Sequence, residues 1–167
     1  MTVEQFIKSV EQEQGALRRF LRTLCRGDAA KADDIAQEAL LKAYLHFGDF
    51  NGKSKFSTWL YRIAFNSFSD WSASAIRKER NRDSLDAPSA RKVAAQADDH
   101  QDFKSLYEAI DGLSEDERSC VILFYMEERS ISEISNIINK PSGTVKSHLS
   151  RARVHLKSKL QTLEEWK

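Results

Sequence analysis

Residues 130–153 decide the fold of the C-terminal part of the chain, and they read SISEISNIINKPSGTVKSHLSRAR. Ser130 followed by Glu133 is a capping box, which is typical of the first turn of a helix. Asn139 is one of the few non-glycine residues that readily adopt a left-handed backbone conformation. The pattern therefore predicts two short helices within residues 130–160, joined by residues 139–142.

The second of these helices has one apolar face and one polar face. Val145, Leu149 and Ala152 recur at the spacing of a buried helical stripe. On the outer and flanking faces, long cations can reach phosphates or guanine edges, and hydroxyls can contact bases. These side chains are Lys146, Ser147, Ser150, Arg151 and Arg153. Gly143 and Thr144 lie at the predicted N-terminus of the helix, where free N–H groups suit a phosphate. Such a pair of helices is typical of a helix-turn-helix, whose second helix enters the major groove.

The charge of the chain is balanced in total but unevenly distributed. Its 26 Lys+Arg and 25 Asp+Glu side chains give a formal net charge of +1. Residues 103–140 carry four basic and eight acidic side chains, whereas residues 141–167 carry six basic and two acidic ones. A segregated basic block indicates a polyanionic partner better than the total does. A two-helix hairpin with a merely solvated basic face is the alternative, and turn residues, core spacing and charge together favour DNA binding.

Length and composition exclude several classes of protein. The 167 residues suffice for one ordinary domain or two small ones. Six Gly and two Pro are too few to punctuate many short strands. No run approaches about 18 apolar residues, and the first residues do not resemble a secretory signal. We expect an all-α, cytoplasmic protein with no membrane insertion of its own.

The composition of residues 82–102 predicts a linker. They hold only two large apolar side chains, Leu85 and Val93, and cannot bury enough surface to offset the entropy lost on ordering. On either side, apolar residues recur at helical spacing, so we expect two small helical domains, residues 1–81 and residues 103–167. The expected helices cover residues 3–10 and 17–24, 35–43, about 57–80 and 103–110, with a break at 27–28 and a loop at 50–55. Ser114 and Glu117 form a second capping box.

One helix of the first predicted domain carries acids and an amide on a single face. Asp34, Gln37 and Glu38 are spaced i, i+3, i+4, and Lys42 continues that face. Such a face suits a basic or amide-rich partner. The alternative is a solvated helix N-terminus whose acids complement the helix dipole.

Aromatic and basic residues alternate between residues 50 and 71. Lys53, Lys55, Arg62 and Asn66 are interleaved with six aromatic side chains, an arrangement that suits stacking on unpaired bases while following a nucleic-acid backbone. The aromatic residues are Phe56, Trp59, Tyr61, Phe65, Phe68 and Trp71. Phe50 and Phe56 are the better candidates for meeting a base, whereas we expect Trp59 and Phe65 in the core. A basic track follows with Arg77, Lys78, Arg80 and Arg82.

These residues resemble a known family. DIAQEALLKAY (34–44), FNG (50–52) and FSTWLYRIAFN (56–66) are similar to region 2 of bacterial sigma factors. LSEDER (113–118) and GTVKSHLSRAR (143–153) are similar to region 4. Two such domains with a short linker, and no region 1 or 3, resemble the extracytoplasmic-function (ECF, group 4) class of the sigma-70 superfamily.

The resemblance implies a factor that binds RNA polymerase core and directs promoter-specific transcription initiation, with promoter DNA as the second partner. Asp34, Gln37, Glu38 and Lys42 would dock on the clamp helices of the largest subunit, and the polymerase flap is a further partner. Such factors are commonly held inactive by an anti-sigma factor, often at the membrane. Two sets of residues would contact the promoter. The −10 set is Phe50, Lys53, Lys55, Phe56, Arg62, Asn66, Asp70, Arg77 and Arg80, with a base flipped from the non-template strand held near residues 50–57 and Asn66. The −35 set is Gly143, Thr144, Lys146, Ser147, Ser150, Arg151 and Arg153.

The chain departs from the family pattern at three positions. Ser135 and Asn139 stand where Ala and Gly are usual, and Phe124 occupies a position that is often basic. These departures leave the fold intact and bear on the −35 sequence preference.

Two other classes of protein compete with this interpretation. An ordinary helix-turn-helix regulator explains residues 103–167 equally well, but it does not explain the aromatic run beside a basic loop. An enzyme is disfavoured, because the chain has no Gly-rich phosphate loop or nucleophile elbow, and its four histidines are scattered. The nearest approach to a metal cluster is Asp98-Asp99-His100 with Asp102, in the predicted linker, so we expect no metal site and no cofactor.

Overall fold

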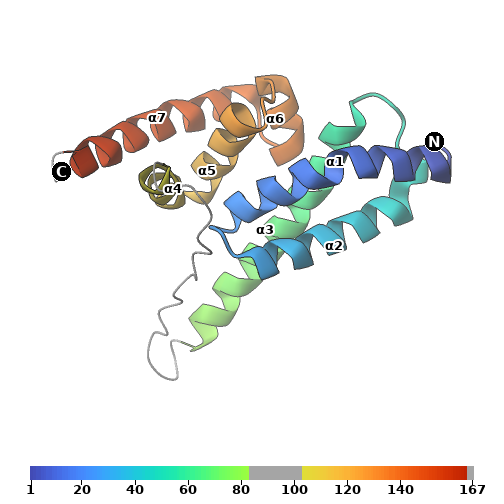
Figure 1. The fold of residues 1–167 in the computed structure, drawn as a ribbon, viewed down its shortest axis with the longest axis horizontal. Coiled ribbons are helices and arrows are strands. Elements are labelled where there is room, and N and C mark those ends of the chain that lie inside the picture. The colour runs from blue at the N-terminus through green and yellow to red at the C-terminus, as the bar shows by residue number, and fades with distance from the viewer. Residues whose placement is uncertain (83–102, 165–167) are drawn as a thin grey trace. The chain divides into compact units, whose positions relative to one another are not determined.

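The computed structural model describes residues 1–82 and 103–164, and the statements below refer to these residues. Within them the chain consists of helices, turns and loops without a strand, which confirms the all-α prediction. The chain divides into two compact units, residues 1–94 and 95–167 (Figure 1). The division and almost all of the predicted linker, with its acidic group Asp98-Asp99-His100 and Asp102, lie outside the described residues. The domain boundaries therefore stay a prediction.

The first unit is built from three long helices. They are α1 (Val3–Leu24), α2 (Ala29–His46) and α3 (Phe56–Arg82), with a 3₁₀ turn, η1 (Phe47–Asp49), after α2. In Figure 1, α1 and α2 run side by side, and the last turns of α3 extend beyond both. The two apolar repeats predicted before residue 25 lie on one continuous helix. The predicted break is confirmed, because Gly27 has a φ of 81° and the Asp28 side chain caps α2.

The core of the first unit is mainly apolar. Its fully buried members come from all three helices, and the aromatic ring of Phe20 lies 5.1 Å from that of Tyr61. They include Leu17, Phe20, Leu21, Ala36, Ala39, Leu60, Tyr61 and Ala64. This packing leaves one face of α2 and one face of α3 free for other contacts.

The second unit packs four helices around its own core. They are α4 (Lys104–Asp111), α5 (Glu115–Val121), α6 (Ile131–Ile138) and α7 (Ser142–Glu164), with a π-helical segment, η2 (Ile122–Met126), after α5. The helix α7 packs against α4, α5 and α6. The buried side chains include Ile110, Leu123, Ile134, Ile137, Val145, Leu149 and Ala152.

Of the two predicted capping boxes, only one is complete. At the start of α6, the Ser130 hydroxyl accepts from Glu133 N–H while the Glu133 carboxylate accepts from Ser130 N–H. At the start of α5, Ser114 accepts from Glu117 N–H, but the Glu117 carboxylate lies 3.1 Å from His155 Nδ1 on α7. The second box is therefore incomplete, because its carboxylate is shared between Ser114 and a partner from another helix.

The turn between α6 and α7 is stabilised from both sides. Asn139 has a φ of 53° and a ψ of 48°, the left-handed conformation that the sequence predicts. The Ser135 hydroxyl donates to the Lys140 carbonyl at 2.6 Å, and the Lys140 ammonium lies 2.7 Å from Asp116 Oδ2 on α5. Ser135 therefore forms a bond across the turn that an alanine could not form.

Candidate nucleic-acid interface

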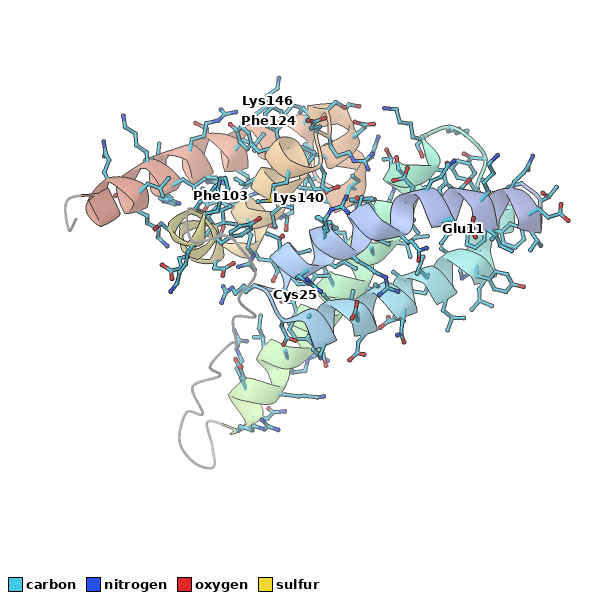
Figure 2. The ribbon with its side chains drawn as sticks, in the orientation of Figure 1. Glu11, Cys25, Phe103, Phe124, Lys140 and Lys146 are labelled. Carbon is cyan, nitrogen blue, oxygen red and sulfur yellow. The ribbon has the colours of Figure 1, made fainter. Side chains whose placement is uncertain are left out.

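The N-terminal half of α7 presents a row of polar side chains away from the core. Val145, Leu149 and Ala152 are at most 2% exposed, as predicted from their spacing. All five outward side chains of the −35 set are exposed: Lys146, Ser147, Ser150, Arg151 and Arg153. Figure 2 shows the Lys146 side chain extending away from the helix. Val154, which sequence reasoning missed, is 65% exposed and continues the row of Ser147 and Ser150 at helical spacing.

The two arginines of this face are held by different neighbours. Arg153 Nε donates to the Tyr125 hydroxyl on η2 at 2.6 Å. Arg151 Nη2 lies 3.0 Å from His148 Nδ1, and Arg151 Nε lies 3.9 Å from Glu117 Oε1. The contacts with Tyr125 and Glu117 had no local signal, because these partners lie far from α7 in the chain, whereas His148 precedes Arg151 on the same helix at the i, i+3 spacing.

At the start of α7, Gly143 is exposed and Thr144 is half-buried. A Cβ atom placed on Gly143 would meet no atom within 4 Å, so nothing within this unit requires a glycine there. The first N–H groups of a helix are unpaired by the helix itself, and its dipole favours an anion. The geometry is therefore open to close approach by a phosphate.

In the first unit, the structure brings the predicted −10 residues of α3 onto one surface. At 3.6 residues per turn they fall within about a quarter of the helix circumference, and all are exposed. They are Arg62, Asn66, Asp70, Arg77 and Arg80. The exposed Lys53 and Lys55 precede them in the predicted loop, where Gly52 has a φ of 70° and the Asn51 side chain accepts from Lys53 N–H.

The aromatic residues beside this loop form a ring cluster. Phe50, Phe56 and Trp59 are half-buried, with centroids 5.5–5.8 Å apart. The buried Phe6 of α1 adds a fourth ring, 5.9 Å from Phe56. Phe65 is buried as predicted, but the prediction of a core position for Trp59 is wrong: Trp59 lies one turn into α3, beside the loop, where packing is incomplete.

On α2, the predicted partner-binding residues lie on one exposed face, with a link to α3. Asp34, Gln37 and Glu38 are exposed, while Lys42 is half-buried. The Lys42 ammonium lies 2.6 Å from Glu38 Oε1, donates to the Ser67 hydroxyl at 3.1 Å and lies 3.9 Å from Asp70 Oδ2. Lys42 therefore joins the α2 face to the −10 set and offsets the negative charge of Asp70.

Two leucines extend the α2 face and were missed from the sequence. Leu41 is 59% and Leu45 is 67% exposed. They follow Glu38 at i+3 and i+7, so they share its side of the helix. Contiguous exposed apolar residues beside polar ones are typical of protein-binding surfaces. The helical spacing of Asp34, Glu38, Leu41 and Leu45 was the signal in the sequence that could have identified this extended face.

Comparison with known families accounts for both units. Residues 9–82 match the family "Sigma-70 region 2", and residues 103–156 match "Sigma-70, region 4". The chain belongs to the sigma-70 family. An ECF RNA polymerase sigma factor of Bacillus subtilis, SigW, is 35% identical over 82% of this chain and 79% of its own length. The RNA polymerase sigma-H factor of Pseudomonas aeruginosa is 34% identical over 81% of this chain and 76% of its own.

Solved structures support the same assignment. The sigma factor RpoE of Bartonella quintana, in complex with the anti-sigma factor NepR, has a TM-score of 0.79 at 29% identity. The alignment covers 95% of this chain and 98% of RpoE. CnrH, in complex with the cytosolic domain of CnrY, has a TM-score of 0.72 at 19% identity and supports the fold alone.

The chain is therefore an ECF sigma factor, which directs promoter-specific transcription initiation with RNA polymerase and is not an enzyme. The match of residues 9–82 to region 2 overturns the rival interpretation as an ordinary helix-turn-helix regulator. None of the helices in the described residues combines the length and apolar character that a membrane-spanning helix needs.

Proposed function

We propose that this sigma factor binds polymerase and promoter DNA through three separate surfaces. The exposed face of α2, with Asp34, Gln37, Glu38 and the neighbouring leucines, docks on the clamp helices of the polymerase largest subunit. The loop at residues 50–55 and the exposed face of α3 hold the melted −10 element. The N-terminal half of α7 reads the −35 element in the major groove. We further propose that the factor acts in the cytoplasm.

The observation that carries this proposal is the single-sidedness of α7. The five outward side chains of the −35 set from Lys146 to Arg153 are exposed, whereas the opposite stripe is buried. A helix with one buried and one cationic face, preceded by a left-handed turn, has the form of a major-groove reader. The open space over Gly143 supports a phosphate contact at the start of the same helix.

The aromatic rings of the −10 surface pack against one another and are therefore only partly available for stacking on an unpaired base. Because Phe50 and Phe56 already pack against other rings and are half-buried, a flipped base would meet only part of each ring, together with the polar groups of the loop. Extruding a base costs a few kcal/mol, and stacking returns about 1–3 kcal/mol per base. Stable opening therefore needs the affinity supplied by polymerase, and we expect the isolated chain to bind promoter DNA weakly.

RpoE of Bartonella quintana was solved with an anti-sigma factor. We propose that a protein of the same class holds this chain inactive, covering surfaces that polymerase would otherwise occupy.

The test is transcription in vitro by bacterial core polymerase and the full chain on a genomic library, with start sites mapped. Lys146→Ala should lower discrimination between a mapped promoter and its −35-substituted form by about 1–3 kcal/mol. Asn66→Ala should impair promoter opening without weakening core binding. Lys8→Ala removes a cation on the exposed side of α1 and serves as the charge-matched control. Tight, sequence-specific DNA binding by the isolated chain would contradict the proposal, as would loss of core affinity in Asn66→Ala.

A further inference from the structure

A line of charged and imidazole side chains joins α5 and the turn to the flank of α7. In order, its members are Lys140, Asp116, His148, Arg151, Glu117 and His155. The polar atoms of successive members lie 2.7, 3.8, 3.0, 3.9 and 3.1 Å apart. No residue of this line except Arg151 belongs to the DNA-contacting face described above.

Within this line, the exposed side chain of Arg151 lies between the buried side chains of Glu117 and His148. Glu117 is 6% and His148 is 9% exposed, whereas the Arg151 side chain is 59% exposed. The guanidinium is therefore held from beneath by a carboxylate on one side and an imidazole nitrogen on the other. A long side chain that is fixed in this way loses fewer rotamers when it binds a base edge or a phosphate.

The hydrogen bond between Arg151 and His148 defines the state of the imidazole. A guanidinium can only donate, so His148 Nδ1 must be the acceptor and must carry no proton. A proton on Nδ1 would remove the acceptor and place a second positive charge 3.0 Å from Arg151 Nη2. The remaining ring nitrogen, Nε2, is buried without a hydrogen-bond partner, 3.8 Å from Asp116 Oδ2.

We propose that Glu117 and His148 are positioning residues for the −35 contact of Arg151, and that protonation of His148 weakens this contact. The inference rests on the proposed role of α7 in reading the −35 element. It adds two residues that do not touch DNA, and it gives −35 recognition a dependence on pH.

The other charged groups around His148 set the direction of the effect. Asp116 favours the added proton, while Arg151 and Lys140 oppose it. Burial acts to raise the pKa of Glu117, but the hydrogen bond and charge of His155 and the bonds from Ser114 outweigh it, so the pKa lies below its usual value. Burial raises the pKa of the Cys120 thiol to about 12, so this neighbour stays neutral. His148 and His155 are the two imidazole side chains of this line, and imidazole is the side-chain type that serves as a switch near physiological pH.

The experiment uses the full chain with bacterial core polymerase and two DNA duplexes: a promoter mapped by the library experiment and its −35-substituted form. The ratio of the two affinities is measured between about pH 5.5 and 8. The wild-type ratio should fall about fivefold as the pH is lowered, the size expected when one hydrogen bond is lost. His148→Asn should flatten this slope and keep the high ratio, because its amide oxygen can accept from Arg151 at every pH.

Controls separate the titrating group from its neighbours. His148→Ala and Glu117→Gln should each lower the ratio several-fold at pH 8, and neither should lower it further when Arg151→Ala is already present. His155→Asn should keep the slope. His46→Asn, on the exposed end of α2 and outside the proposed contact surfaces, is the matched control and should keep both the ratio and the slope.

The outcomes distinguish this inference from the proposed function. An unchanged ratio in Arg151→Ala would contradict the −35 role of Arg151 itself. A lowered ratio in Arg151→Ala, with no change in His148→Ala, would overturn only the positioning role. A slope that disappears in His155→Asn rather than in His148→Asn would overturn it as well. Should a variant fold poorly, ¹⁵N NMR of the wild-type chain decides: His148 Nδ1 must resonate as an unprotonated acceptor, and a protonated Nδ1 at pH 8 overturns the proposal.

Discussion

The two candidate DNA surfaces of this sigma factor are held in place by different forces. Around the loop at residues 50–55, aromatic rings pack against one another, and Phe6 joins rings from α2, η1 and α3. On α7, the cationic face is held by hydrogen bonds and ion pairs to Tyr125, Glu117 and the imidazole of His148. One surface is therefore organised by apolar burial and the other by polar contacts.

This difference fits the DNA that each surface would meet. A melted strand presents the faces of unpaired bases, which require an apolar, aromatic surrounding. A duplex presents a fixed pattern of donors and acceptors, which requires donors held in fixed positions. Apolar packing is insensitive to protonation, whereas charged contacts are not. The two units should consequently respond differently to mutation and to pH.

The largest effect is expected at Phe6, which is 5% exposed and contacts three rings. Phe6→Ala should lower the free energy of unfolding of the first unit by about 3–5 kcal/mol, because it removes a buried ring and leaves a cavity. The loss is measured by urea unfolding, with the hydrogen-exchange protection of backbone amides monitored separately in each unit. Protection in the second unit should be unchanged.

The same substitution should separate the two DNA contacts. With the −10 loop no longer supported, promoter opening by the holoenzyme should fall, while discrimination at the −35 element is retained. Lys8→Ala, on the exposed side of α1 near Phe6, is the control. Equal loss of both contacts would mean that ring packing does not act on the loop alone.

Glu117 gives the second unit a dependence on pH that the ring cluster lacks. Its pKa is lower in the folded chain than its ordinary value of 4.5, so its stabilisation is present above that value and is lost as the pH falls through the folded pKa. Glu117→Gln should lower the free energy of unfolding by about 1.5–3 kcal/mol at pH 7, the worth of a hydrogen bond to a charged group.

Urea titrations of the two proteins at several pH values measure this difference. It should shrink towards zero as the pH falls from 4.5 through the lower folded pKa, because the carboxylate then becomes neutral in both states. Glu11→Gln, at an exposed position of α1, should produce no such pattern. A difference between wild type and Glu117→Gln that stays constant with pH would show that the carboxylate acts by packing and not by charge.

Much of the fold was readable from the sequence because local signals agreed with the final packing. The spacing of Val145, Leu149 and Ala152 identified the buried stripe of α7, and Asn139 identified the left-handed turn. The candidate DNA faces followed from the same reasoning, because the side chains left over from a buried stripe must be exposed. Their roles in binding DNA remain predictions.

The sequence did not predict the contacts between segments that lie far apart in the chain. The second capping box is incomplete because His155, 38 residues away, shares the Glu117 carboxylate with Ser114. Trp59 was misplaced because its burial depends on how the loop rings of Phe50 and Phe56 pack against it, which periodicity does not encode. The link from Lys42 to Asp70 was hidden for the same reason: it spans two helices.

The turn before α7 offers a smaller test of how the polar surface is held. Asn139→Ala should lower the free energy of unfolding by about 1–2 kcal/mol, because alanine is disfavoured in the left-handed conformation. Asn139→Gly adopts it freely and should change little. Ser135→Ala removes the hydrogen bond to the Lys140 carbonyl and should cost about 1 kcal/mol. Thermal unfolding of the three variants ranks these effects, and equal losses in Asn139→Ala and Asn139→Gly would contradict the backbone explanation.

The smallest effect on stability is expected at Gly143, and its direction is the informative quantity. Glycine in a helix is less favourable than alanine, and a Cβ there would meet no atom within 4 Å. Gly143→Ala should therefore raise the free energy of unfolding by about 0.5 kcal/mol. If a phosphate approaches this backbone, the added methyl group should nevertheless weaken promoter binding by the holoenzyme, and more so for a duplex than for a −10 single strand. The first loop offers the matched glycine: Gly52, with its φ of 70°, should lose stability on the same substitution. A Gly143→Ala variant that is both more stable and equally active would show that DNA does not approach the start of α7, and would leave the side chains of Lys146 to Arg153 as the whole of the −35 contact.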